Sequence, residues 1–215
     1  ANSASYDSLT NLIINTPAST STADVNAAIF GTDLRGRENV ISHNTINNGS
    51  QGIRLEGISI AIPAESFVID SNRITGFYSH GIYNGFTSRM KARGNIITVS
   101  SPSAASIYGI YGTNTDSAFD ISANRITIEN STSISYGIYN TLSNATAVGR
   151  ARIANNKITA VNGNTGNLYG IYQTGTTFCD VRNNVVSVNS TASTVYGLYL
   201  TAGSANTYYN NTANN

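Results

Sequence analysis

The sequence predicts an all-β fold, a parallel β-helix solenoid of about seven coils of roughly 28 residues, with three short strands in each coil. Three observations support this fold. A four-residue phrase containing glycine and tyrosine recurs, a single asparagine recurs in constant phase with it, and apolar residues alternate with polar ones on both sides of that asparagine. Two markers in constant phase indicate one structural unit that is stabilised by stacking on its neighbours.

The first marker is a phrase of the form Tyr-Gly-Ile-Tyr. Its five copies begin at His80, Tyr108, Tyr136, Tyr169 and Tyr196, and Gln51-Gly52-Ile53-Arg54 is a degenerate earlier copy. Their glycines are 29, 28, 28, 33 and 27 residues apart. We expect the isoleucine to point inward, so that strand alternation sends the first aromatic residue of each phrase inward and the last tyrosine outward.

The second marker is an asparagine that recurs through the whole chain. The series is Asn11, Asn44, Asn72, Asn95, Asn124, Asn156, Asn184 and Asn211, in steps of 33, 28, 23, 29, 32, 28 and 27 residues. Asparagine tolerates the left-handed backbone conformation that a bend requires, and its amide can bond to an identical amide above and below. We therefore expect a structural ladder formed by Asn44, Asn72, Asn95, Asn124, Asn156 and Asn184.

Apolar residues flank each asparagine at fixed distances. Three residues before it stand Ile41, Ile69, Ala92, Ile121, Ile153 and Val181, and two residues after it stand Ile46, Ile74, Ile97, Ile126, Ile158 and Val186. This alternation predicts two short strands with one buried face, and the tyrosine phrase supplies the third. The polar stretches Ser100–Ser103 and Thr113–Asp116 are expected to be connections. The single cysteine, Cys179, aligns with Phe67, Met90 and Phe119, which predicts a buried residue.

The composition limits the classes of partner. The chain has 215 residues with a formal net charge of +1, and only 11% of its residues are charged. We therefore expect no nucleic-acid partner, which would require clustered Lys and Arg. No apolar stretch is long enough to span a membrane. Asn, Ser and Thr make up more than a third of the chain, but the apolar residues recur in register, which favours an ordered fold.

The repeats predict one continuous body without a domain boundary. Residues 1–36 form an irregular first coil and residues 37–215 the regular coils. A solenoid normally has polar caps at its ends, whereas here the repeat pattern reaches both ends. The sequence is therefore expected to be a segment of a longer protein, with neighbouring coils of that chain as its first partners.

The inward aliphatic pattern and the asparagine bend resemble the right-handed parallel β-helix proteins of the pectate-lyase-like superfamily. The resemblance covers nearly the whole chain and implies a right-handed coil. That superfamily includes polysaccharide lyases and hydrolases, epimerases, phage tailspikes and noncatalytic bacterial surface adhesins. The repeats vary in length by only a few residues, which favours a structural role like that of the adhesins, and the resemblance implies an extracellular or cell-surface location in a bacterium.

The charged residues allow an enzymatic interpretation. An outward position on successive coils is occupied by Lys91, Asp120, Arg152 and Asp180. In a polysaccharide lyase, hydrolase or epimerase the two aspartates would be catalytic, with Lys91 or Arg152 as base. The alternating signs also fit a ladder of opposite charges that fixes the register of neighbouring coils, and we favour this second interpretation. His43 and His80 have no partner in register, and we expect no catalytic residue, metal site or cofactor.

The outward tyrosines are the better candidate binding site. Tyr83, Tyr111, Tyr139, Tyr172 and Tyr199 would form an aromatic stripe suited to an extracellular glycan or a protein partner. The inward set, Tyr108, Tyr136, Tyr169 and Tyr196 with His80, would form an internal stack. Alternatively, the loops at 131–135 and 162–167 cover the stripe. We expect a noncatalytic stalk, filament or adhesin segment that can assemble as a homo-oligomer, with a pure glycan-binding module as a further alternative.

Overall fold

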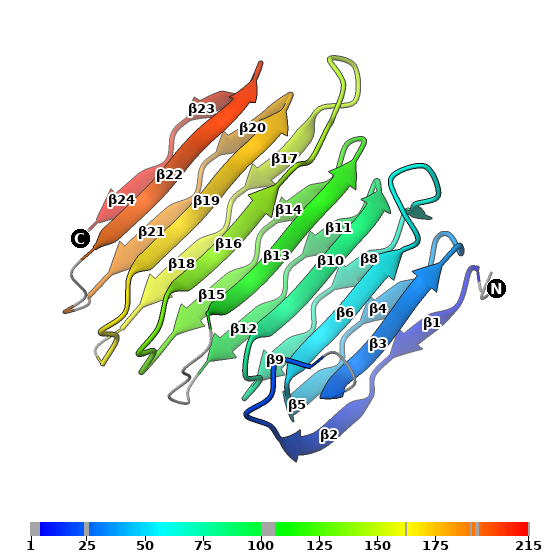
Figure 1. Ribbon diagram of the computed structural model, residues 1–215, viewed down its shortest axis with the longest axis horizontal. Helices are drawn as coiled ribbons and strands as arrows, with labels where there is room; N and C mark the ends of the chain where they lie inside the picture. Colours follow the sequence, from blue (N-terminus) through cyan, green and yellow to red (C-terminus); the bar gives the residue numbers. More distant parts are fainter. Residues whose placement is uncertain are drawn as a thin grey trace.

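The computed structural model describes residues 5–23, 26–99, 106–161, 163–189, 191 and 194–214. It is all-β and winds through about seven turns of a parallel β-solenoid, which confirms the predicted fold class. Every pair of neighbouring strands in its three stacked sheets runs parallel. Figure 1 shows the coils side by side along a slab, with the N-terminal strands at one end and the C-terminal strands at the other.

Each coil contributes one strand to each of three sheets, which we name A, B and C. Sheet A contains β1 (Ser8–Thr10), β4 (Val40–Ser42), β8 (Val68–Asp70), β11 (Lys91–Arg93), β14 (Asp120–Ser122), β17 (Ala151–Ala154), β20 (Cys179–Arg182) and β23 (Thr207–Tyr209). Sheet B contains β2 (Ile13–Ala18), β5 (Thr45–Gly49), β9 (Arg73–Thr75), β12 (Ile96–Val99), β15 (Arg125–Ile128), β18 (Lys157–Ala160), β21 (Val185–Val188) and β24 (Thr212–Asn214). Sheet C contains β3 (Ala27–Leu34), β6 (Gln51–Gly57), β10 (His80–Ser88), β13 (Ile107–Asp116), β16 (Ser135–Thr141), β19 (Leu168–Thr177) and β22 (Val195–Ser204), with β7 (Ala64–Glu65) paired to β10.

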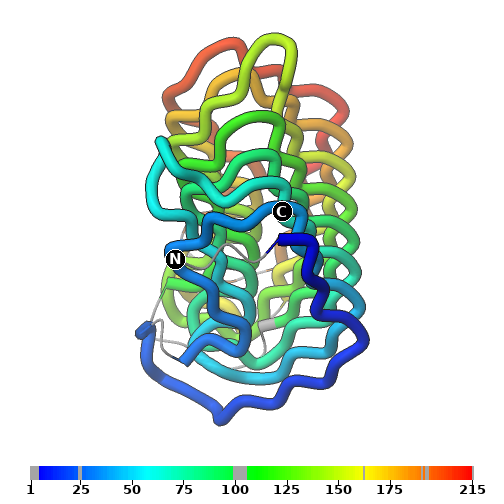
Figure 2. Tube along the Cα trace, turned by 90° about the vertical axis from the view of Figure 1, so that its right-hand side faces the viewer, coloured from blue at the N-terminus to red at the C-terminus, as the bar shows by residue number. Residues whose placement is uncertain are grey.

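The three sheets enclose one narrow core. Figure 2, turned by 90°, shows the successive coils stacked along the solenoid. Each sheet contributes a column of buried aliphatic side chains, represented in one coil by Ile121 from sheet A, Ile126 from sheet B and Ile110 from sheet C. Cys179 is fully buried in the same core cluster, as its alignment with Phe67 and Phe119 predicts. Stacking places equivalent side chains in contact, so each interior coil buries its apolar face against two others.

The strands of sheet C are longer than the sequence predicts. Thr113–Asp116 was expected to be a connection, but these residues form the end of β13. Their side chains are small and polar, yet Thr115 is buried and its Oγ1 lies 2.6 Å from Ser143 Oγ of the next coil. Polar residues can occupy this strand because they are hydrogen-bonded inside the coil. The other expected connection, Ser100–Ser103, lies outside the described residues.

The asparagine amides form a continuous buried ladder between sheets A and B. Asn124 makes four hydrogen bonds through its side chain. Its Oδ1 accepts from the backbone N–H and from Nδ2 of Asn95, both at 3.0 Å. Its Nδ2 donates to the Ala92 carbonyl at 2.9 Å and to Asn156 Oδ1 at 3.0 Å. Both donors and the acceptor of this buried amide are therefore satisfied.

The same side-chain contact links every neighbouring pair in the ladder. The Nδ2 of each asparagine lies 2.9–3.1 Å from Oδ1 of the next, through Asn44, Asn72, Asn95, Asn124, Asn156, Asn184 and Asn211. Asn11 does not belong to this ladder, because the Leu12 backbone N–H donates to Asn44 Oδ1 and Leu12 precedes Ile13, the partner of Thr45. The alignment is therefore wrong by one residue in the first coil.

The left-handed conformation expected of the ladder asparagines belongs to the residue before each of them. These preceding residues have φ between +52° and +61°, and they are His43, Ser71, Gly94, Ala123, Asn155, Asn183 and Asn210. At each bend, two consecutive residues therefore have different structural roles. One residue turns the backbone, and the asparagine that follows directs its amide inward to satisfy the neighbouring coils.

Inward isoleucines are expected to carry the stability of the coil. The substitution Ile138→Asp would place a carboxylate at a fully buried position without a partner, which should lower the free energy of unfolding by about 3–5 kcal/mol. Thr141→Asp on the partly exposed end of the same strand should cost under about 1 kcal/mol. Urea denaturation of both variants measures the difference, and equal losses would contradict the assigned orientation.

The ladder should be sensitive to a single deletion. Asn124→Ala removes four hydrogen bonds and leaves buried polar groups of Asn95 and Asn156 unpaired, so unfolding should become easier by about 2–4 kcal/mol. The matched control is Asn155→Ala. Asn155 is exposed, and the equivalent bend position one coil earlier is already occupied by an alanine, Ala123. Thermal unfolding should show a large shift for the first variant and a small one for the second. Similar shifts would remove the special role of the ladder.

Candidate functional site

Sheet C carries two parallel columns of aromatic rings on its outer face. The first ladder contains His80, Tyr108, Tyr136, Tyr169 and Tyr196, and the second ladder contains Tyr83, Tyr111, Tyr139, Tyr172 and Tyr199. Within each ladder the ring centroids of successive coils are 4.6–5.4 Å apart and the rings are stacked. Sheet C faces the viewer in Figure 1.

The two ladders also contact each other, edge to face. Tyr108 and Tyr111 have centroids 5.1 Å apart at an interplanar angle of 85°, and Tyr136 and Tyr139 repeat this contact at 4.9 Å and 83°. Stacked and edge-to-face pairs each stabilise by about 0.5–1.5 kcal/mol beyond burial of their area. The ten rings therefore form one rigid aromatic surface.

The prediction that Tyr108, Tyr136, Tyr169 and Tyr196 point inward is wrong. Their rings are partly exposed, with Tyr196 at 42%, and they lie beside the outward set. The glycine between the tyrosine and the isoleucine breaks the alternation. A Cβ on Gly109 would meet core atoms of Ile126 at 2.7 Å and the Gly137 carbonyl oxygen at 2.5 Å, so this backbone position faces the interior directly before Ile110 does the same. Two consecutive inward residues leave both tyrosines outside.

An arginine continues the second ladder in the earlier coil. Arg54 pairs in register with Tyr83, and its guanidinium carbon lies 3.9 Å from the centroid of that ring. Glu56 lies 2.8 Å from Arg54 Nη2 and 3.4 Å from the Tyr83 hydroxyl. This is a cation–π contact with its counter-ion beside it. The degenerate phrase ending in Arg54 thus retains the stacking role, which the sequence alignment does not reveal.

Burial raises the pKa of several phenols in the two ladders. Burial, followed by the charge of Glu56, raises the pKa of Tyr83 to about 12. Burial and the neighbouring tyrosines raise the pKa of Tyr139 to about 12, and they raise the pKa of Tyr136 as well. The surface therefore presents neutral hydroxyl groups over the whole physiological pH range.

The loops considered as covers for the tyrosines lie at the turn between sheets B and C. The Ser131 backbone N–H donates to Asn164 Oδ1 at 2.8 Å, and the Thr165 N–H donates to the Ser131 carbonyl at 2.9 Å. These loops thus pair with each other from coil to coil, while the tyrosines of both ladders stay partly exposed. Asn162, at the start of the second loop, lies outside the described residues.

The charged positions on sheet A are ion-paired. Asp120 is 7% exposed and lies between two arginines of the neighbouring coils. Arg93 Nε donates to its Oδ2 at 2.7 Å, and Arg152 Nε donates to its Oδ1 at 3.1 Å. Burial alone would raise the pKa of Asp120, but hydrogen bonds from Arg152, Ser122 and Arg93 outweigh this and hold the pKa below its usual value.

Asp180 is paired with a residue that sequence reasoning missed. Its partner is Arg150, whose Nε lies 2.8 Å from Asp180 Oδ1 and which precedes β17. Burial alone would raise the pKa of Asp180, but hydrogen bonds from Arg150 and Thr207 outweigh this effect and lower the pKa below its usual value. Asp180 therefore also stays ionised. Strand alignment could not find Arg150, because it lies outside the aligned strand positions. An ionised aspartate can act as a base but not as a general acid.

In the described part of the chain, no three His, Cys, Asp or Glu side chains gather as a metal site would require. Over the same residues, no helix has the length and hydrophobicity needed to cross a membrane. Comparison with protein-family models, curated proteins and solved structures found no match for this chain. The candidate functional site is therefore defined by its own geometry, the paired tyrosine ladders of sheet C.

The first ladder begins with His80, a histidine whose burial should make the stability of the fold depend on pH. Burial, followed by the charge of Arg54, lowers the pKa of His80 from 6.5 to about 3. Between these values only the unfolded chain takes up this proton, so stability should fall as the pH drops below 6.5. His80→Tyr restores the tyrosine found in the other coils and removes this titration.

Melting temperatures at pH 7 and pH 4.5 check the prediction. The unaltered protein should lose more stability over this interval than His80→Tyr, because the two proteins share all their carboxylates and differ only in the His80 titration. His43→Asn serves as the matched control, because His43 is exposed at a bend where asparagine occurs in later coils. Parallel pH profiles for the unaltered protein and His80→Tyr would show that His80 does not control acid sensitivity.

Proposed function

We propose that this chain is a rigid structural and adhesive segment of a large secreted or surface-displayed bacterial protein. In this proposal sheet C is its adhesive face, and the paired tyrosine ladders bind an extended extracellular glycan. The observation that supports the proposal most directly is the repetition of partly exposed, neutral tyrosines in every coil from 80 to 199. The resemblance to noncatalytic adhesins of the pectate-lyase-like superfamily is in keeping with this role.

The rigidity of the ladders favours binding. Each ring is held between two others and against the second ladder, so little side-chain freedom remains to be lost when a ligand binds. The apolar C–H face of a sugar ring packs on an aromatic ring, and the phenol hydroxyl can bond to sugar hydroxyls. Several such weak contacts along one polymer add through multivalency where one would not suffice.

The enzymatic alternative lacks an equivalent supporting observation. A polysaccharide hydrolase needs one protonated and one ionised carboxyl group across the scissile bond. Asp120 and Asp180 are both held ionised by arginines and belong to coils separated by the coil of Arg152. Their geometry supports the charge ladder, in which opposite charges fix the register of sheet A.

Replacing three rings of the second ladder tests the adhesive face. The triple substitution of Tyr111, Tyr139 and Tyr172 by serine should weaken attachment to bacterial or host polysaccharide by at least about tenfold, since each lost contact contributes multiplicatively. Replacing the same three residues by phenylalanine keeps the stacked rings and removes only the hydroxyls. Glycan-array binding and titration of the strongest hit measure both effects at a temperature where all variants are folded.

A matched control substitutes the outward residues of another sheet. Thr98, Thr127 and Thr159 lie in register on sheet B, so the triple change to serine alters three stacked positions away from the tyrosines. This control should bind like the unaltered protein. Binding that survives the loss of all three tyrosines, or that falls equally in the control, would refute the adhesive role of sheet C.

A further inference from the structure

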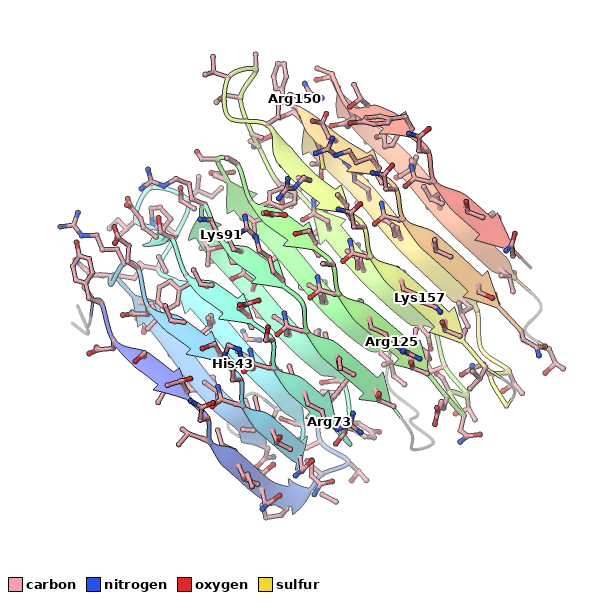
Figure 3. The ribbon with its side chains drawn as sticks, turned by 180° about the vertical axis from the view of Figure 1, so that it is seen from behind. His43, Arg73, Lys91, Arg125, Arg150 and Lys157 are labelled. Atoms are coloured by element: carbon pink, nitrogen blue, oxygen red, sulfur yellow. The ribbon has the colours of Figure 1, made fainter. Side chains whose placement is uncertain are left out.

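The near-zero net charge of the chain conceals a segregation of charge. Eight of its 12 Lys and Arg residues lie on sheets A and B or directly before one of their strands: Arg73, Lys91, Arg93, Arg125, Arg150, Arg152, Lys157 and Arg182. In Figure 3, Lys91 and Arg150 lie over sheet A, and Arg125 and Lys157 over sheet B, on the side opposite to sheet C. This face therefore carries more cations than carboxylates, although the chain as a whole is nearly neutral.

The cations converge on one pocket over sheet A. The pocket has a volume of about 300 Å3 and lies across β11, β14, β17 and β20. Five cations line it: Lys91, Arg93, Arg150, Arg152 and Arg182. The two carboxylates that also line it are Asp120 and Asp180, which leaves a net charge of +3.

The internal ion pairs do not use all the donors of these cations. Asp120 forms salt bridges with Arg93 and Arg152, whose side chains stay 41% and 38% exposed. Asp180 forms a salt bridge with Arg150. Arg182 bonds through Nη1 to the Tyr209 hydroxyl at 3.0 Å, while its Nε is buried without a hydrogen-bond partner. A buried guanidinium donor without an acceptor is costly, so a shift of the Arg182 side chain towards an anion in the pocket would be favoured by the hydrogen bond it gains.

We propose that this pocket binds phosphate, either free or as a monoester. Two features favour a doubly charged tetrahedral oxyanion over a carboxylate. A dianion offsets more of the +3 charge than a singly charged group can. Guanidinium groups also present paired N–H donors that match the oxygen atoms of a phosphate, and arginines from three coils approach the pocket from different positions along the solenoid.

Calorimetric titration of the whole chain at low ionic strength tests this site with inorganic phosphate as the probe. One equivalent should bind saturably at pH 8, and inorganic sulfate, also a dianion, should compete. Methyl sulfate and galacturonate, which carry one charge, should bind at least about fivefold more weakly. At pH 5 phosphate binding should weaken, because phosphate then takes up its second proton and carries a single charge, whereas sulfate stays doubly charged and its binding should not change.

Substitutions within and beside the pocket separate a built site from a diffuse charge effect. Arg182→Gln should weaken phosphate binding by at least about fivefold. Arg125→Gln removes the same charge from exposed sheet B and should change it by less than about twofold. Asp120→Asn works in the opposite direction, because it frees Arg93 and Arg152, and should tighten binding by about threefold or more. Circular dichroism verifies that each variant is folded.

The outcomes decide both the site and the source of the ligand. Similar affinity for inorganic phosphate and glucose 6-phosphate assigns the pocket to the phosphate group itself, and tighter binding of the ester assigns it to a phosphorylated sugar. The proposal is overturned if no saturable binding occurs or if galacturonate binds as tightly as phosphate. Equal losses in Arg182→Gln and Arg125→Gln would also overturn it, since they would show only an adventitious attraction to a basic face.

Discussion

The buried amide ladder between sheets A and B is the constraint on which the register of the whole solenoid depends. Parallel backbone pairing alone would tolerate a slip of the chain, because every residue offers the same N–H and C=O groups. A slip of one residue would break all four hydrogen bonds of each interior asparagine side chain. Two of these bonds join it to the side-chain amides of the neighbouring asparagines, one to a backbone N–H and one to a backbone carbonyl. Leaving those groups buried and unsatisfied is costly, so each coil is fixed against the next. Stacking of tyrosines and arginines elsewhere requires this fixed register.

The two broad faces use that register for different chemistry. On sheet C, identical side chains of successive coils lie next to each other, and stacking between neutral aromatic rings is stabilising. On sheet A, equal charges would repel, so the coils alternate Lys91, Asp120, Arg152 and Asp180. The aromatic face is therefore continuous, whereas the charged face has local centres where cations outnumber carboxylates. A single fold thus presents one continuous aromatic surface and one surface with local positive charge.

The repeat spacing was sufficient to predict the coil, because period and alternation both follow from backbone geometry. Orientation within the tyrosine phrase was not predictable by alternation, since Gly109 and Ile110 both face the core and only glycine permits that close approach. The left-handed residue was misplaced by one position because asparagine suits both roles at a bend. Arg150 was missed because it reaches Asp180 from a connection, and connections carry no repeating pattern. Sequence periodicity therefore determines the coil path better than the chemistry of its surface.

The residue before each ladder asparagine has a consequence for variation and for engineering. Histidine, serine, glycine, alanine and asparagine all occupy it with nearly the same positive φ, although residues such as alanine and serine rarely adopt this backbone conformation. The bend is thus imposed by the neighbouring coils rather than by the residue that makes it. Such a position can change its side chain without changing the path of the chain. Spectroscopic labels attached there would form a row of marks at one-coil intervals, a built-in scale for measuring stretch or twist along the solenoid.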